Sequence, residues 1–206
     1  MTSDTLPRVA RASGVASVAV AFAGILAAAA SAPWFSWTTN ALSDLGVAGG
    51  LTAGLFNYSL VAAGALALPF AWWLAATAAS RVGVLTAVGF AATGACMAGV
   101  GLFPSDTALH YPVAAGTYLG LTYTLALDAS DAAVAGAARR ALAGIWGALG
   151  HLTMWIVWAV AGSAVGVSGL ALPEVGGSLL LAAWVTVTAR CRSQPSARSA
   201  AENPAR

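Results

Sequence analysis

Six long apolar stretches, separated by short segments rich in polar residues, Gly or Pro, follow one another along the 206-residue chain. About 20 mainly apolar residues in a helix cross the hydrocarbon core of a bilayer, and Gly or Pro within such a helix is tolerated there. The pattern therefore predicts an all-α fold, an integral membrane bundle of six transmembrane helices. The predicted spans cover residues 14–32, 51–76, 82–103, 112–128, 141–163 and 173–189.

Composition strengthens this prediction, because 59% of the residues are hydrophobic and only 8% are charged. An ordinary soluble domain has about 25% charged residues, so a water-soluble fold is excluded. The six spans and their loops use nearly the whole chain. We therefore expect a cytoplasmic N-terminus at 1–13, a six-helix transmembrane domain at 14–190 and a disordered cytoplasmic tail at 191–206.

The positive charges predict the topology. All nine are Arg, and they precede the first span, separate the second from the third and the fourth from the fifth, or follow the sixth. If the spans alternate in direction, every Arg falls on one side, which the positive-inside rule assigns to the cytoplasm. The expected location is the cell membrane, multi-pass, with both termini cytoplasmic. Charges scattered in this way form no patch for nucleic acid, and the expected partners are membrane lipids.

An alternative for residues 1–32 is a cleaved signal peptide, because two Arg precede an apolar stretch that ends in small residues at 30–32. The stretch is longer than the usual apolar region of a signal, which is about 7–15 residues. Pro33 directly after the cleavage position also disfavours processing. We therefore expect the first span to be retained.

Polar residues gather in the loops on the side without Arg, at 33–46, at 103–112 and at the start of the sixth span. Asp44, Asp106, His110 and Glu174 are the acids and the imidazole of that side. No cation of the chain faces these acids apart from His110 when it is protonated. The candidates for compensating the negative charge of these acids are an ion, a cationic substrate and a shared proton.

Each of these residues also has a structural explanation. Asp44 precedes the second span, where it can cap backbone N–H groups, and Asp106 follows Pro104 in a turn. Glu174 complements a helix N-terminus. His110 begins the fourth span, and a hydrogen-bonded structural role competes there with a functional one.

His151 stands in the middle of the fifth span. A neutral imidazole that shares an interhelical hydrogen bond is the favoured interpretation at this depth. The chain has no Gly-x-Ser-x-Gly, Walker-type or His-Glu-x-x-His motif, and its two His are too few for a His-rich metal or haem site. We therefore predict neither a metal nor a cofactor.

Three motifs resemble a known family, the predicted membrane proteins grouped as domain of unknown function 998. They are NALSDLG at 40–46, FNYSL at 56–60 and GLFPSDTALHYPVA at 101–114. The resemblance covers about residues 14–190 and implies a polytopic membrane protein without an established reaction. The resemblance also implies that the family shares a set of polar and turn residues, which match Ser43, Asp44, Gly46, Asn57, Pro104 and His110 here.

The Arg distribution and the family resemblance both indicate one candidate binding cluster on the outer face, made of Ser43, Asp44, Asn57 and His110. Within this cluster we expect Asp44 and His110 to be neighbours. The favoured function is binding or transport of a lipid, small solute or ion. One alternative is an interfacial enzyme that acts on a lipid or isoprenoid, with His110 as base or ligand and Asp44 as its orienter. The other is a structural membrane subunit. The oligomeric state stays open.

Overall fold

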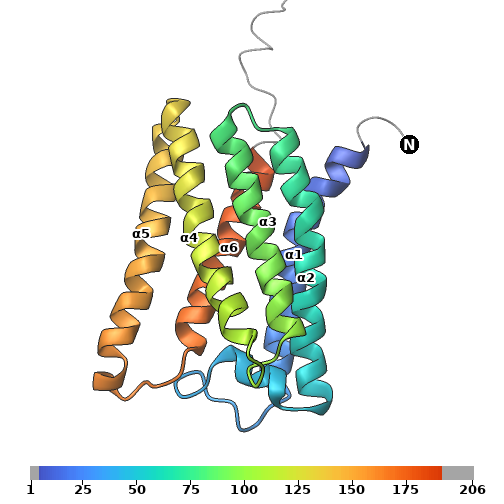
Figure 1. The fold of residues 1–206 in the computed structure, drawn as a ribbon, viewed down its shortest axis with the longest axis vertical. Coiled ribbons are helices and arrows are strands. Elements are labelled where there is room, and N and C mark those ends of the chain that lie inside the picture. The colour runs from blue at the N-terminus through green and yellow to red at the C-terminus, as the bar shows by residue number, and fades with distance from the viewer. Residues whose placement is uncertain (1–4, 192–206) are drawn as a thin grey trace, which may run out of the picture.

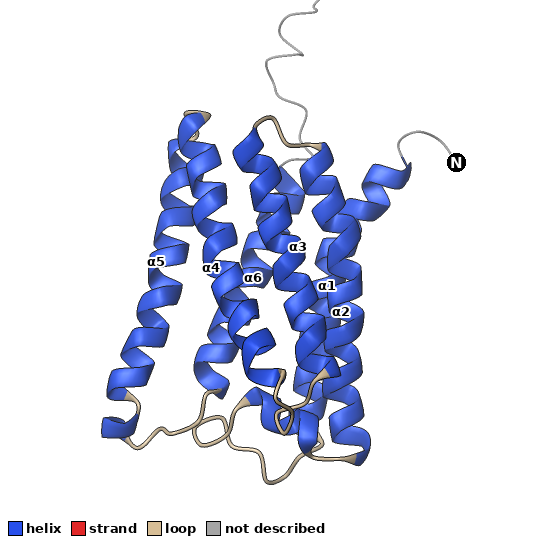
Figure 2. Cartoon of the chain, in the orientation of Figure 1, coloured by secondary structure: helices blue, strands red, loops and turns tan. Residues whose placement is uncertain are grey.

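The computed structural model describes residues 5–191 and is built of helices, without a β-strand in that range (Figures 1 and 2). Six long helices form the bundle, and two short 3-10 helices lie in its connections. The long helices are α1 (Thr5–Ala30), α2 (Gly50–Ala76), α3 (Arg81–Leu102), α4 (His110–Val134), α5 (Ala138–Ala161) and α6 (Ala171–Cys191). The short ones are η1 (Leu42–Val47) and η2 (Ser163–Val165).

Each of the helices α1 to α5 packs antiparallel against the next; α2 to α5 form a row, and α1 and α6 lie behind it (Figure 1). α6 contacts α1, α4 and α5. We call the end where α1 begins and α6 ends the terminal end. The opposite end, which carries the connections at 31–49, 103–109 and 162–170, is the loop end. The halves of the bundle next to them are the terminal half and the loop half.

Five of the six long helices are long and apolar enough to cross a membrane. α4 is the exception because its 25 residues include several Thr and Tyr together with Asp128 and Asp131. It nevertheless has a similar length to its neighbours and lies between α3 and α5. The chain is thus a multi-pass membrane protein with an all-α fold, as predicted. The alternation of the helices also places every Arg within 5–191 at the terminal end.

Two helices are longer than the apolar pattern predicts. α1 begins at Thr5, so part of the segment expected as an N-terminal extension is helical. α4 continues to Val134, past the predicted end at 128, because Asp128 and Asp131 both have partners there. Arg140 of α5 forms an ion pair with Asp128 through two nitrogens and lies 3.6 Å from Asp131. The predicted tail lies, except for Cys191, outside the described residues.

Small residues allow α3 and α4 to approach closely. A Cβ atom added at Gly116 would lie 2.7 Å from Cys96 Sγ, and one added at Gly120 would lie 2.6 Å from Thr93 Oγ1. Both distances are too short for a side chain, so neither glycine accepts one without movement of the neighbouring helix. Gly116 and Gly120 therefore form a contact surface of small residues between the two helices.

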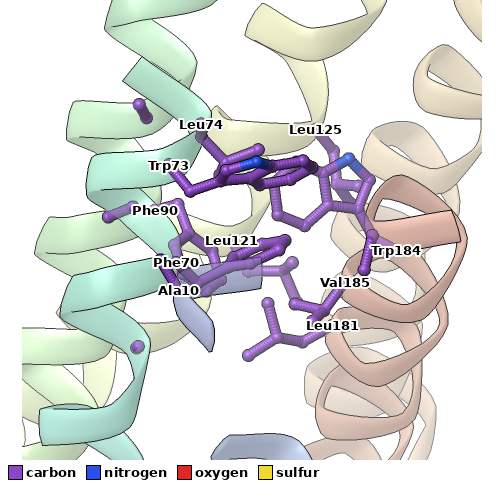
Figure 3. Close-up of a cluster of buried hydrophobic side chains, with 14 of the residues drawn as sticks. Ala10, Phe70, Trp73, Leu74, Phe90, Leu121, Leu125, Leu181, Trp184 and Val185 are labelled. Carbon is purple, nitrogen blue, oxygen red and sulfur yellow. The ribbon is translucent and has the colours of Figure 1, made fainter. Parts of the chain in front are cut away.

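Aromatic side chains fill the terminal half (Figure 3). The Phe70 ring stacks on Trp73 with centroids 5.3 Å apart and meets Phe90 edge to face at the same distance. Phe90 in turn lies 5.5 Å from Trp184 of α6. These rings join α2, α3 and α6, and each of them is at least nine-tenths buried. Aromatic pairs at these separations are attractive beyond the area they bury, so this half is a tightly packed core.

Candidate functional site

The loop half contains a cavity between α1, α2, α3, α4, α6 and η1. Between atom surfaces, and including the open space at its mouth, it measures about 770 Å³. About 60 Å³ of it is open to the centre of a water-sized sphere. Leu121 and Leu181 line the cavity and also belong to the packed core. They therefore form its floor, which faces the terminal half.

The cavity is amphipathic. Aliphatic and aromatic side chains of α1, α2 and α3 supply an apolar wall, in which Phe22, Ile25 and Phe56 take part. The polar side chains come from α4, α6 and η1. They are Ser43, His110, Thr117, Tyr118, Glu174 and Ser178. The sequence-predicted residues Ser43 and His110 thus meet at one cavity, together with an acid that the predicted cluster did not include.

Glu174 is buried in the cavity wall, with 7% of its surface exposed. Its Oε2 accepts a hydrogen bond from the backbone N–H of Leu42 at 2.6 Å. The Tyr118 side chain lies in interaction range of both Glu174 and Ser178. No Arg or His of residues 5–191 lies within ion-pair distance of this carboxylate. Within the same range no three His, Cys, Asp or Glu side chains converge as a metal site would need.

The segment 38–44, of which Leu42 and Ser43 line the cavity, is attached to the start of α6. Gly169 N–H donates to the Thr38 carbonyl at 3.0 Å, and Ala171 N–H donates to the Asn40 carbonyl at 2.9 Å. A Cβ atom at Gly169 would lie 2.3 Å from the Asn40 carbonyl oxygen, so only glycine permits this approach. With the bond from Leu42 to Glu174, these contacts fix η1 across the cavity.

Asp44 supports η1 and does not line the cavity. Its Oδ2 accepts the backbone N–H of Ala41 and the side-chain amide of Asn40, both at 3.0 Å. The carboxylate therefore caps η1, and the N-cap of α2 is Gly49 instead. None of the hydrogen bonds of Asp44 or His110 joins these two side chains. Their expected proximity is thus not produced by a direct contact.

Asn57 also faces η1. Its Nδ2 donates to the Gly46 carbonyl at 2.9 Å, while its buried Oδ1 has no hydrogen-bond partner among the described residues. A Cβ atom at Gly46 would lie 2.7 Å from that Oδ1. Gly46 therefore makes room for Asn57, and together they hold η1 on the start of α2.

His110 has one ring nitrogen committed to the protein. Its Nδ1 lies 2.7 Å from the Phe103 carbonyl oxygen, which can only accept, so Nδ1 carries the proton. In the neutral ring Nε2 then has a free lone pair. Because His110 lines the cavity, this nitrogen is the group that a ligand can use as a hydrogen-bond acceptor or a base.

His151 has partners on both ring nitrogens. The Trp155 indole N–H donates to Nε2 at 3.2 Å, which leaves the proton on Nδ1, and Nδ1 donates to Thr122 Oγ1 at 2.8 Å. Thr122 belongs to α4, so the predicted interhelical hydrogen bond of a buried histidine is confirmed. The Tyr118 ring lies 6.1 Å from the imidazole, and His151 itself does not line the cavity.

Sequence reasoning explained Glu174 as a helix-end acid and passed over Tyr118 and Ser178. One signal pointed to Glu174: it is an acid inside a predicted span on the side without Arg. Tyr118 and Ser178 carried no signal of this kind, because a Tyr and a Ser are ordinary residues of a membrane helix. Their place at the cavity follows from the packing of α4 against α6.

Apolar spanning helices around an amphipathic cavity define a multi-pass membrane protein with a candidate ligand site. The chain belongs to the family described as protein of unknown function (DUF998), whose model matches residues 15–190. The resemblance carried by the three motifs is thus confirmed over the whole bundle. Searches of curated proteins and of solved structures gave no significant match to the chain.

Proposed function

We propose that this membrane protein binds a lipid or another amphiphilic small molecule in the loop-half cavity. The headgroup lies among Ser43, His110 and Glu174, and the apolar tail runs along α1 and α4 toward Leu121 and Leu181. The observation that carries the proposal is the amphipathic lining of one cavity, with its polar groups on α4, α6 and η1 and an apolar wall opposite.

The dimensions suit a single chain of moderate length. From His110 to Leu121 the helix α4 rises about 16 Å, comparable to an extended decyl chain with its headgroup. A headgroup at the polar side chains and an apolar tail on the floor account for both parts of the lining.

The closed floor favours binding over an open passage. Phe70, Trp73, Phe90 and Trp184 fill the terminal half below Leu121 and Leu181, so a solute in the cavity has no continuation toward the terminal end. Transport would need this aromatic core to separate. Binding needs no such change, and we therefore propose binding as the basic activity.

The enzyme alternative receives less support. It assigned Asp44 as the orienter of His110, whereas the Asp44 carboxylate caps η1 and the Phe103 carbonyl accepts the His110 Nδ1 proton. An assembly role needs no cavity. The amphipathic lining therefore favours a ligand-binding protein over both alternatives.

Direct binding measurements test the proposal. Protein in nonionic maltoside micelles is titrated with radiolabelled decyltrimethylammonium, decyl sulfate and decanol, and uptake by protein-free micelles is subtracted. We expect saturable binding of at least one of the three. Ala114→Leu should abolish it because Ala114 lines the cavity, whereas Ala126→Leu on an exposed face of the same helix should not.

Two results would contradict the proposal. The first is the absence of saturable binding for all three amphiphiles. The second is saturable binding that Ala114→Leu and Ala126→Leu reduce equally, which would locate the site on the lipid-facing surface.

The orientation in the membrane is part of the same proposal: the loop end faces outward and both termini are cytoplasmic. The support is that every Arg of the described chain lies at the terminal end. In a background with Cys96 and Cys191 replaced by Ala, an impermeant thiol reagent should label Thr38→Cys in intact cells. It should not label Ala137→Cys until the cells are opened. Labelling in the reverse order would refute this topology.

A further inference from the structure

The cavity has an acid without a basic partner. Glu174 is the one carboxylate in its lining, and neither Arg nor Lys contributes to it. His110 is the one lining side chain that can carry a positive charge, and it is not within ion-pair distance of Glu174. The arginines of the described chain lie at the other end of the bundle. When Glu174 is ionised, its negative charge is therefore not compensated by an Arg or Lys of the lining.

The buried carboxylate is only partly satisfied by the protein. Its Oε2 accepts the Leu42 N–H, whereas the Ser178 hydroxyl donates to the Glu174 backbone carbonyl at 2.9 Å and not to the carboxylate. A carboxylate away from water loses hydration that one amide does not replace, so it is costly until an opposite charge arrives. By contrast, the carboxylates of the terminal half have Arg140 beside them.

Aromatic rings complete the surroundings of a positive charge. Phe22, Phe56 and Tyr118 line the same cavity from three different helices. The face of an aromatic ring attracts a cation, and the attraction grows when water is excluded. Ser43 and Ser178 add hydroxyl oxygens that accept hydrogen bonds. An anionic headgroup would meet the carboxylate and these ring faces without any Arg or Lys to hold it.

We propose that the ligand of the cavity is an amphiphile with a positively charged headgroup, an amine or a quaternary ammonium, paired with the Glu174 carboxylate. This inference rests on the binding function proposed above and specifies its ligand class. The charge of the ligand supplies the partner that the protein does not give to Glu174. The tail lies along α1 and α4, and its end reaches the floor.

The three amphiphiles of the binding experiment already separate the two proposals, because they share the decyl chain and differ in headgroup charge. Wild-type protein should bind decyltrimethylammonium at least tenfold more tightly than decanol, and decyl sulfate more weakly than decanol. Equal binding of all three would overturn the charge inference and leave the amphiphile site intact. Absence of binding by all three would overturn both proposals.

Substitution of the acid provides the second test. Glu174→Gln keeps a carbonyl oxygen for the Leu42 N–H and removes the charge, so it should reduce decyltrimethylammonium affinity at least tenfold and leave decanol affinity unchanged. Asp106→Asn is the matched control, because Asp106 is an exposed acid at the same end of the bundle. An equal loss in both variants, or no loss in Glu174→Gln, would show that Glu174 does not hold the cation. The headgroup preference of the wild type needs no variant and decides the inference if Glu174→Gln does not fold.

Discussion

The two halves of the bundle differ in how the space between the helices is filled and in how their acids are paired. In the terminal half, rings from α2, α3 and α6 fill the centre, and Arg140 pairs with Asp128 and Asp131. In the loop half, the same helices leave a cavity, and the acid in its wall has no basic partner. In the terminal half the protein itself supplies the opposite charge for its acids and fills the space between the helices. In the loop half it does neither. That contrast is typical of a scaffold joined to a ligand site.

The difference has a cause in how the helices end. The terminal half is joined by short connections at 77–80 and 135–137, and its helices meet directly. At the loop end, η1 and the segment before it cross the bundle and are fixed by backbone contacts to α6. A lid of this kind holds the helix ends without filling the space between them.

The largest effect should come from removing a ring of the packed half. Phe90→Ala leaves a void between Phe70 and Trp184 and should lower the free energy of unfolding by about 3–5 kcal/mol. Phe22→Ala is its counterpart in the loop half, where the removed ring only enlarges an existing cavity. Phe22→Ala should therefore lower the free energy of unfolding clearly less than Phe90→Ala. Denaturation in mixed micelles, followed by circular dichroism, measures both, and equal losses would contradict the contrast between the halves.

Substitutions that add volume should also destabilise the protein more in the terminal half than in the loop half. Ala67 is fully buried, and a Cβ atom at the facing Gly94 would lie 2.8 Å from the Ala67 Cβ. Ala67→Leu should therefore destabilise the protein by about 1–3 kcal/mol through overpacking. Ala114→Leu places the same three carbons in the cavity and should cost less than about 1 kcal/mol. The same unfolding assay applies, and a larger loss for Ala114→Leu would mean that the cavity closes in solution.

The cap of η1 should have a smaller effect. Asp44→Ala removes the acceptor of the Ala41 N–H and of the Asn40 amide, and we expect a loss of about 1–2 kcal/mol. Asp106→Ala, at an exposed position of the other loop, should change the unfolding free energy by less than about 0.5 kcal/mol. If the two substitutions had the same effect, Asp44 would have no capping role.

The smallest effect should be the coupling between Asp44 and His110, which the sequence motifs led us to expect as neighbours. Their hydrogen bonds go to different groups. The unfolding free energies of Asp44→Asn, His110→Gln and the double variant should therefore be additive within about 0.5 kcal/mol. A coupling energy above about 1 kcal/mol would restore the predicted pair and make Asp44 part of the site.

The sequence by itself determined the class of the protein. Its apolar stretches predict spanning helices because unpaired backbone groups are not tolerated in lipid, and its Arg positions divide the loops between two sides. The motifs around Ser43, Asn57 and His110 lie at the end of the bundle that contains the cavity. These features are local, since each depends on composition or on residues close together in the chain.

Only the tertiary structure decided which polar residues meet. Asp44 and Glu174 are both acids near a helix start in the sequence, yet one caps η1 and the other faces the cavity. Tyr118 and Ser178 come to the site because α6 packs behind the row of helices, next to α4. Contacts between residues far apart in the chain depend on the rotation and spacing of the helices. Hydrophobic periodicity says little about either here, because lipid-facing and core-facing positions are both apolar in a membrane bundle.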